Sequence, residues 1–334
     1  MRSKFFFSLK SVKPQEKHAK GSITQVTSDH VPGFENISFS SLKLKKGGAQ
    51  APIWHPSSQK VGYCLQGDGL VSMRTPNGVE TFTIEKGDIF FIPKGYVHYI
   101  ANLGKHELSV VFTYNHSKPN MMSVSNAIHS LSGSVFEATF GEQPSFLKGL
   151  SKSKKEELVL TLPPLKKGHY PSSNRYKFNI EKSSETVLTK GGYLQATTKT
   201  HLSVLNGLGI LGFGLNPKGA VEPHWHTNAG ELIYIVKGHT RITVLSPEGK
   251  TEVMEVRGGE GAFAPASYFH NIENVGKENA EIIAFFNHAE PDYIGIGEVI
   301  GAHSNEVLGS IFKVKPSYFE TLKKPTGPLV IVPV

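Results

Sequence analysis

One motif occurs twice in this chain, and its two copies keep an almost constant distance from each other. Trp54 and Trp225 each precede a histidine, and they lie 171 positions apart. The same offset separates Gly48 from Gly219, Pro52 from Pro223 and Gly67 from Gly238. Further along, an offset of 172 separates Pro93 from Pro265, His98 from His270 and Asn102 from Asn274. Because this period is far longer than that of a solenoid repeat, the register predicts two tandem domains of the same fold.

Each copy has the pattern of an all-β domain. Between residues 36 and 115, short apolar segments alternate with turn signals such as Pro76-Asn77-Gly78, which is typical of β-hairpins. The 34 glycines and 20 prolines fit a protein with many turns. The alternation is lost over residues 124–157 and 304–322, where short helices are expected. The sequence therefore predicts two β domains, each followed by a short helical appendix.

The repeat also sets the expected domain boundaries. We expect a lead-in over residues 1–35, an N-terminal domain over 36–157, a linker rich in proline, lysine and serine over 158–177, and a C-terminal domain over 178–334. The apolar residues 329–332 are expected to form a strand that pairs with a sheet of the other domain.

The second copy carries the residue types of a metal site. His224 and His226 alternate on a predicted strand, so their imidazoles point to the same face. Glu231 begins the next strand across a turn, and an antiparallel hairpin brings its carboxylate beside the histidines. His270 arrives from a distant strand. Three imidazole nitrogens and one carboxylate oxygen suit a divalent ion such as Mn, Fe, Ni, Zn or Co; the alternative is a set of ordinary strand histidines.

The first copy has lost part of this donor set. Ile53 and Lys60 stand in place of the first histidine and the carboxylate, whereas His55 and His98 are retained. An ammonium group a few ångströms from a divalent ion opposes its binding, so we expect one metal ion per chain, in the C-terminal domain. Lys60 can instead bind an anion, or turn its amine toward solvent as lysine side chains often do.

The residues of both copies resemble the two sequence motifs of the cupin family, and in particular its two-domain members, the bicupins that include oxalate decarboxylase. The first motif matches His224, His226, Glu231 and Gly238. The second matches Gly259, Pro265, His270 and Asn274, with Ser267 in place of one glycine, and it is complete in the N-terminal copy. The resemblance covers most of residues 36–322. It implies two tandem jelly-roll β-barrels whose metal ligands point into the barrel.

The resemblance also implies a function. It favours a metal-binding bicupin, with Mn as the first candidate ion, that acts on a small carboxylate as a decarboxylase or oxidoreductase, like oxalate decarboxylase and oxalate oxidase. It further implies a homo-oligomer, a trimer or hexamer, with the helical appendices as contacts. Relatives of this kind carry an arginine three residues before the paired histidines, where this chain has Val221 and, in the first copy, Gln50. Two alternatives therefore stay open, a non-catalytic germin-like or seed-globulin-like binding or storage protein and a cupin dioxygenase or isomerase.

Glu222 is the candidate for proton transfer. Because it lies two residues before His224, strict alternation places it on the ligand face, where it can act as a general acid or base or support a ligand. A carboxylate at the barrel rim is the alternative, since Pro223 can disturb the alternation. Tyr268 and Phe286 are candidates for lining the cavity, or for packing in the core.

Charge and composition disfavour other classes of protein. The net charge of +8 comes from lysines scattered among acidic residues, so we expect no nucleic-acid partner but a small, anionic substrate or ligand. No apolar segment reaches the length of a membrane span, and residues 5–7 are too short for the core of a signal peptide. With Cys64 as the single cysteine, no intrachain disulfide can form, and we expect a cytoplasmic protein without a membrane partner.

Overall fold

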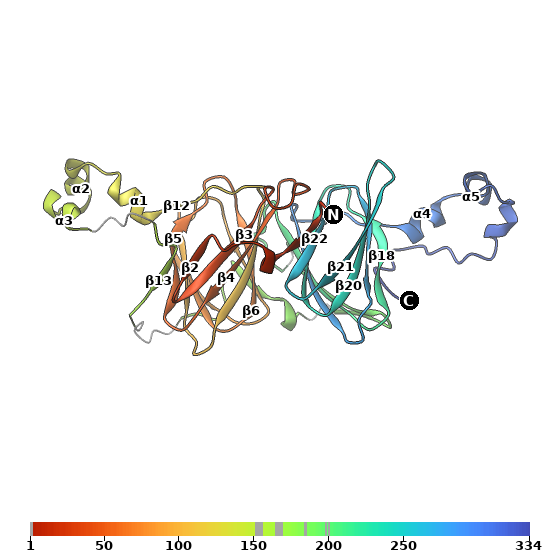
Figure 1. The fold of residues 1–334 in the computed structure, drawn as a ribbon, viewed down its shortest axis with the longest axis horizontal. Coiled ribbons are helices and arrows are strands. Elements are labelled where there is room, and N and C mark those ends of the chain that lie inside the picture. The colour runs from red at the N-terminus through yellow and green to blue at the C-terminus, as the bar shows by residue number, and fades with distance from the viewer. Residues whose placement is uncertain (1–2, 151–155, 164–169, 184–185, 198, 200) are drawn as a thin grey trace. The chain divides into compact units, whose positions relative to one another are not determined.

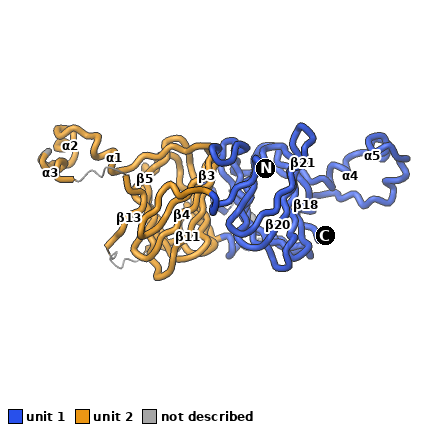
Figure 2. The backbone as a smooth tube through the Cα atoms, in the orientation of Figure 1, with its two compact units in different colours: residues 1–11, 28–37, 180–334 blue, residues 12–27, 38–179 orange. Residues whose placement is uncertain are grey.

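The computed structural model describes residues 3–150, 156–163, 170–183, 186–197, 199 and 201–334. The chain forms two compact units (Figure 2). The C-terminal unit contains residues 1–11, 28–37 and 180–334, and the N-terminal unit contains residues 12–27 and 38–179.

Two antiparallel sheets make up the N-terminal unit. The seven-stranded sheet has the order β14 (Lys177–Asn179), β9 (Asp88–Ile92), β6 (Lys60–Gln66), β11 (Leu108–Tyr114), β4 (Ser38–Leu44), β3 (Gly21–Val26) and β2 (Glu16–His18). The six-stranded sheet has the order β12 (Met122–Ser123), β5 (Gly48–Trp54), β10 (His98–Asn102), β7 (Gly69–Thr75) and β8 (Gly78–Ile84), with β13 (Val159–Thr161) also paired to β5.

The C-terminal unit repeats this arrangement. Its seven-stranded sheet has the order β1 (Phe6–Ser8), β22 (Glu260–Ala264), β19 (Glu231–Lys237), β24 (Ala280–Phe286), β17 (Gly209–Leu215), β16 (Gly192–Thr197) and β15 (Thr186–Thr189). Its six-stranded sheet has the order β21 (Thr251–Arg257), β20 (His239–Leu245), β23 (Phe269–Asn274), β18 (Gly219–Trp225) and β25 (Ile294–Gly295), with β26 (Ile331–Pro333) also paired to β18.

The core of the C-terminal unit lies between its two sheets. On β20, Ile242 and Val244 are buried and alternate with more exposed residues, as expected for a strand with one face toward the core. They belong to the same apolar cluster as Ile233 and Ile235 of β19 in the other sheet. The predicted pair of jelly-roll β domains is therefore confirmed, although the two sheets of each unit stay separate rather than closing into one barrel (Figure 1).

Short helices follow the β region of each unit and extend away from its sheets (Figure 1). They are α1 (Val124–His129), α2 (Gly133–Phe140) and α3 (Pro144–Gly149) in the N-terminal unit, and α4 (Ile296–Ala302), α5 (Asn305–Phe312) and the 3₁₀ helix η3 (Pro316–Phe319) in the C-terminal unit. The Ser132 and Ser304 hydroxyls cap α2 and α5 by accepting hydrogen bonds from main-chain N–H groups of the first turn. The predicted helical appendices are thus confirmed, and no helix among the described residues is long and apolar enough to cross a membrane.

The first strand of each repeat lies in a sheet built mainly from the other repeat. Strands β1 and β14 begin 171 positions apart, at Phe6 and Lys177, and each leads into a single 3₁₀ turn, Leu9–Ser11 or Ile180–Lys182. Yet β1 pairs with β22, and β14 pairs with β9. Residues 1–35, which we expected to be a lead-in, thus contribute β1 to one unit and β2 and β3 to the other.

The prediction that residues 329–332 pair with a sheet of the other domain is wrong. Strand β26 pairs with β18 of its own unit, with Val332 opposite Ala220. The main-chain N–H of Glu222 also donates to the Val330 carbonyl at 2.8 Å. After η3 the chain returns to the edge of its own sheet, where these strand groups need hydrogen-bond partners.

Candidate metal centre

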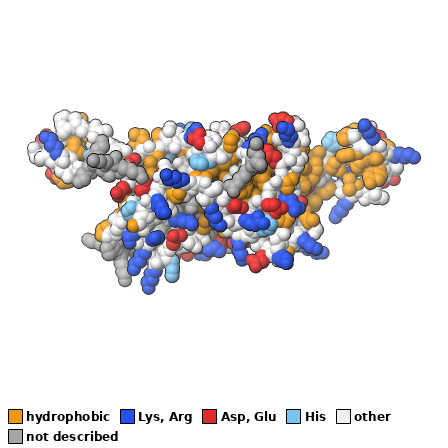
Figure 3. All heavy atoms as spheres, in the orientation of Figure 1, with side chains coloured by type: hydrophobic (Ala, Val, Ile, Leu, Met, Phe, Trp, Pro, Cys, Tyr) orange, Lys and Arg blue, Asp and Glu red, His pale blue; other side chains and the backbone are white. Residues whose placement is uncertain are grey.

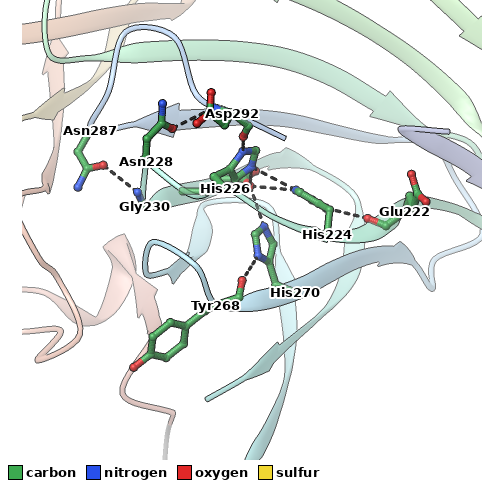
Figure 4. A network of polar contacts seen from close by, with 10 residues as sticks. Glu222, His224, His226, Asn228, Gly230, Tyr268, His270, Asn287 and Asp292 are labelled. Carbon is green, nitrogen blue, oxygen red and sulfur yellow. Dashed lines mark hydrogen bonds and ion pairs between the residues drawn. The ribbon is translucent and has the colours of Figure 1, made fainter. Parts of the chain in front are cut away.

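Three elements of the C-terminal unit bring four potential metal ligands together (Figure 4). His224 lies on β18 and His226 follows it, Glu231 is the first residue of β19, and His270 lies on β23 directly opposite His224. One ligand atom from each of these residues lies within 4.8 Å of all the others, and all four residues are buried. The structure therefore brings the four predicted residues together. The predicted hairpin between His226 and Glu231 is wrong, because β18 and β19 lie in different sheets.

The ligand atoms surround the Glu231 carboxylate. Its Oε2 atom lies 2.8 Å from Nε2 of His270, 3.0 Å from Nε2 of His226 and 3.5 Å from Nε2 of His224. The Nε2 atoms of His224 and His226 are 3.2 Å apart. Three imidazoles and a carboxylate thus face a common point inside the protein.

Main-chain carbonyl groups fix the orientation of all three rings. Nδ1–H of His224 donates to the carbonyl of Glu222 at 2.7 Å, and Nδ1–H of His270 donates to that of Tyr268 at 2.8 Å. His226 makes the equivalent bond to the carbonyl of Asp292. With the proton on Nδ1, each Nε2 lone pair points to the centre, and lone pairs this close repel unless a proton or cation lies between them. The donor set fits a divalent first-row metal ion.

Burial and hydrogen bonding set the charges at this centre. Burial, together with the charge of the neighbouring His270, lowers the pKa of His224 to about 4. Burial alone would raise the pKa of Glu231, but the three histidines hold it well below its ordinary value, because any proton at the centre is shared between a ring Nε2 and the carboxylate. Burial also opposes protonation of His226, although Glu231 raises its pKa on balance. The carboxylate is therefore ionised, and the site presents one negative charge to a cation.

Glu222 is engaged by three segments rather than by the metal ligands. Its carboxylate accepts hydrogen bonds from the main-chain N–H of Gly297 at 2.9 Å, the main-chain N–H of Leu329 at 3.0 Å and the hydroxyl of Tyr293 at 3.3 Å. Its carboxylate points away from His224 in Figure 4. Glu222 therefore touches the ligand set through its main-chain carbonyl and through Tyr293.

Tyr293 is a site residue that the sequence analysis missed. Its ring stacks on that of His224, with centroids 4.6 Å apart and planes inclined by 20°. Burial raises its pKa above the ordinary value, and the nearby Glu222 adds to the effect. Tyr293 lies in no recognisable motif, and its distance from His224 along the sequence does not predict a contact. Only the folded path of the loop before β25 brings the two rings together.

A cavity of about 250 Å³ opens onto His224, His226 and Glu231. Phe286, a predicted cavity residue, lines it, whereas Tyr268 is not part of the lining and packs edge-to-face against Phe5, with ring centroids 5.9 Å apart. Apolar side chains make up most of the remaining wall, which includes Leu194, Leu211, Phe213, Val221, Val330 and Ile331.

The N-terminal unit keeps two of the ligand positions. The ring centroids of His55 and His98 lie 6.1 Å apart, close to the 5.8 Å between the ring centroids of His226 and His270. Each of the two also has its Nδ1 atom 2.9 Å from a main-chain carbonyl oxygen, of Asn120 for His55 and of Tyr96 for His98. The histidine framework therefore persists although Ile53 supplies no ligand.

Lys60 occupies the position equivalent to Glu231 and is buried. Only 1% of the residue is exposed, and its amine lies 4.3 Å from the centroid of the Phe112 ring. The alternative that Lys60 turns toward solvent is wrong, because the aromatic face attracts the amine inside the protein. Burial lowers the pKa of Lys60 to about 7, and burial together with the Lys60 charge lowers that of His55 to about 3. Among the described residues, this unit offers no complete metal-ligand set.

Comparison with known proteins agrees with the repeat. The family profile described as "Cupin" matches residues 7–146 and again residues 178–318. Oxalate decarboxylase OxdC of Bacillus subtilis (strain 168) is 22% identical over 321 residues, which cover 93% of this chain and 82% of that protein. Germin-like protein subfamily 2 member 2 of Arabidopsis thaliana is 33% identical over 126 residues, 36% of this chain and 58% of that protein.

Solved structures show the same fold. The structure of Bacillus subtilis oxalate decarboxylase at pH 4.6 superimposes with a TM-score of 0.85 at 18% identity, and the match covers 100% of this chain and 88% of that one. A second structure of the same enzyme, from a study of its Mn(II) centers, matches with a TM-score of 0.85 at 19% identity and covers 100% of this chain and 90% of that one.

Proposed function

The chain belongs to the cupin family, and from this premise we propose that it is a metal-dependent bicupin enzyme that acts on a small carboxylate. The observation that carries the proposal is the convergence of His224, His226, Glu231 and His270 on one point, with the carboxylate ionised. We place one metal ion per chain, in the C-terminal unit, because Lys60 and Ile53 replace two of the ligands in the other. A six-coordinate ion held by four protein ligands keeps about two positions open for substrate.

Manganese is the ion we propose first. Imidazole and carboxylate donors accept Mn, Fe, Ni, Zn and Co alike, so the donor types leave those alternatives open. The Mn(II) centers of the Bacillus subtilis oxalate decarboxylase, which shares the fold, support manganese. When bound, the ion supplies Lewis-acid chemistry at a carboxylate oxygen.

The protein's own residues hold and orient the reactants. The carbonyl groups of Glu222 and Tyr268 fix the rings of His224 and His270, and such supporting contacts are commonly worth 10–100-fold in metal affinity. We propose a positioning role for Glu222, because its carboxylate already accepts three hydrogen bonds from Gly297, Leu329 and Tyr293.

A second candidate function is a cupin dioxygenase or isomerase. One observation favours it: the cavity at the ligands has an apolar wall, with no arginine or lysine among the described residues that line it. An enzyme that acts on oxalate would benefit from an arginine in this wall, since a guanidinium binds a small dicarboxylate in a bidentate manner. A germin-like binding or storage role is the third alternative, and it predicts no turnover.

We also infer a homo-oligomer that forms through the helical segments. Apolar side chains gather on the segment that follows β25 (Figure 3), where Val307, Ile311, Phe312 and Tyr318 are 46–72% exposed. Such exposed apolar residues commonly mark protein contacts. A trimer or hexamer and a cytoplasmic location are proposals that rest on the family and on the single cysteine, Cys64.

Metal analysis tests the proposed centre. The protein is purified without chelators or nickel resin, and its metal content is compared with that of His224→Ala and of the control His303→Ala, an exposed histidine of the same unit. We expect about one equivalent of Mn or Fe in the wild type and control, and almost none in His224→Ala. A wild-type protein that binds no metal on reconstitution contradicts the enzyme proposal. About two equivalents would contradict the single centre.

Activity is tested next on the metal-loaded protein. Release of carbon dioxide and consumption of oxygen, measured over a panel of small carboxylates, separate a decarboxylase from an oxidase or dioxygenase. Absence of both signals with a fully loaded centre would leave an isomerase or the binding or storage role.

A further inference from the structure

The cavity beside the metal ligands is almost entirely hydrocarbon. Its volume of about 250 Å³ corresponds to roughly eight water molecules. Leu211 and Phe213 of β17, Val221 of β18 and Phe286 of β24 form its walls, together with Ile331 of β26. A small, strongly hydrated anion would leave most of this surface without a partner.

The polar atoms at the cavity are already committed. Those of His224, His226 and Glu231 face the proposed metal position, and the Tyr293 hydroxyl donates to Glu222. No lysine, arginine, asparagine, glutamine, serine or threonine is among the described residues that line this cavity. The metal is therefore the single group at this wall that can bind an anionic head.

Charge limits what such a cavity can bind. A divalent ion held by one carboxylate and three neutral imidazoles carries one net positive charge. A monoanion neutralises this charge, whereas a dianion such as oxalate leaves one negative charge in an apolar environment. An unpaired buried charge is strongly unfavourable, so the cavity selects against the dianion.

We propose that the substrate is a monoanionic chelating acid with a hydrocarbon side chain, of the 2-oxo or 2-hydroxy acid class with a branched or aromatic substituent. The acid head binds the metal, and the side chain fills the cavity against Leu211, Phe213 and Phe286. This assignment rests on the proposed metal centre and names the substrate class for it.

The segment before and within β26 contributes to this specificity. Val330 and Ile331 line the cavity, and the Leu329 N–H donates to Glu222 at 3.0 Å. Val330 has φ of 55°, a conformation that is unfavourable for a β-branched residue and that hydrogen bonds on both sides maintain. The geometry holds an apolar wall in place opposite the ligands.

Calorimetric titration of the Mn-loaded protein tests the assignment with oxalate, pyruvate and 4-methyl-2-oxopentanoate. The last two share one chelating head and differ by three carbon atoms. Because each buried methylene strengthens binding about fourfold, we expect 4-methyl-2-oxopentanoate to bind about 60-fold more tightly than pyruvate. Oxalate should bind more weakly than the branched acid.

A substitution in the wall should reverse this order. Val221→Arg places a guanidinium at the cavity, so oxalate should gain at least about tenfold in affinity and the branched acid should lose a similar factor. The control Val253→Arg, at a position of β21 that is 59% exposed, should leave the order unchanged. If Val221→Arg does not fold, the affinities of the wild type for oxalate, pyruvate and 4-methyl-2-oxopentanoate still test the substrate class.

The outcomes separate this inference from the function on which it rests. A loaded wild type that binds oxalate at least as tightly as the branched acid overturns the substrate class and leaves the metal enzyme in place. Equal affinity for pyruvate and the branched acid also overturns it, because the cavity then contributes nothing. A protein that takes up no metal overturns the proposed function itself, and metal analysis detects this before any titration.

Discussion

The ring of Tyr293 lies against that of His224, with centroids 4.6 Å apart and the planes 20° from parallel. The Tyr293 hydroxyl reaches Glu222, whose main-chain carbonyl accepts the Nδ1–H of His224. One metal-ligand candidate is therefore held on its face by an aromatic ring and at its edge by a carbonyl, and both supports connect to the same glutamate.

Removing the Tyr293 ring should weaken metal binding. Tyr293→Phe keeps the stacking and should change the Mn dissociation constant only a few-fold, whereas Tyr293→Ala frees the His224 ring and should weaken binding about 10–100-fold. Chelator competition measures both constants. Tyr318→Ala, at a position 72% exposed on η3, is the control. Wild-type affinity in Tyr293→Ala would mean that the stacking does not position the ligand.

Glu222→Gln should lower the stability of the folded site. We expect it to leave proton transfer in the reaction unchanged. The amide retains one acceptor oxygen but turns an NH₂ group toward donors from Gly297, Leu329 or Tyr293, which costs about 1–3 kcal/mol. Thermal unfolding should detect the loss, with the exposed Glu320→Gln as the control.

Kinetics separate this role from proton transfer. If Glu222 transferred the proton, Glu222→Gln would reduce turnover about 100-fold or more and remove one limb of the pH profile. We expect the profile to keep its shape. A lost limb at unchanged stability would contradict the positioning role.

The ligand set was predictable from the sequence because strand geometry is local. His224 and His226 share a face through the two-residue period. The hairpin predicted to bring Glu231 beside them does not form, because β18 and β19 lie in different sheets, and Glu231 meets the histidines between those two sheets. The repeat identified the remaining ligand, since alignment of the two copies places His270 opposite His98. The same alignment shows that Lys60 replaces Glu231 in the first copy. Local periodicity and duplication thus predicted two all-β domains and the candidate site, whereas the jelly-roll fold followed from the resemblance to the cupin family.

Contacts between distant segments were not predictable in this way. Strand β1 pairs with β22 although the repeat would group it with the first copy, and nothing in Phe6–Ser8 specifies that partner. The stacking of Tyr293 and the cavity wall from Ile331 depend on loops whose path only folding sets. The prediction that Lys60 turns its amine toward solvent was wrong. Lysine side chains commonly do so, but here the amine packs over the ring of Phe112.

Lys60→Met should stabilise the protein, and the gain should depend on pH. The pKa of Lys60 falls from an ordinary 10.5 to about 7 in the folded protein. Between these values the unfolded chain binds one more proton than the folded one, so the free energy of unfolding of the wild type rises with pH. Below pH 7 the full cost of the buried ammonium is present. Methionine removes it, a gain on the order of 3–5 kcal/mol near neutral pH.

Urea unfolding of wild type and Lys60→Met at pH 7 and near pH 10 measures this difference. We expect the gain to shrink at the higher pH, where the wild-type amine is neutral in the folded state. The exposed Lys43→Met, on β4 of the same unit, should show no such trend. A gain that stays constant with pH would mean that methionine improves packing rather than removing a charge.

Two substitutions should rebuild a metal site in the N-terminal unit. Ile53 lies opposite His98 as His224 lies opposite His270, and Lys60 begins β6 as Glu231 begins β19. The double variant Ile53→His/Lys60→Glu therefore adds the missing imidazole and carboxylate to a histidine pair that is already oriented. Because the donor set then equals that of the other unit, metal content should rise from about one to about two equivalents.

Two further variants test why the N-terminal unit lacks a metal site. Ile53→His alone should stay near one equivalent, since the Lys60 amine still opposes a divalent ion. Adding His224→Ala to the double variant should return the content to about one, now held entirely in the N-terminal unit. A folded double variant that still binds one equivalent would show that the replaced ligands do not account for the missing site. The buried surroundings of Phe112 and Tyr114, which lie 4.3 and 5.9 Å from the Lys60 amine, would then be the reason, because they exclude the water that completes the coordination of such an ion.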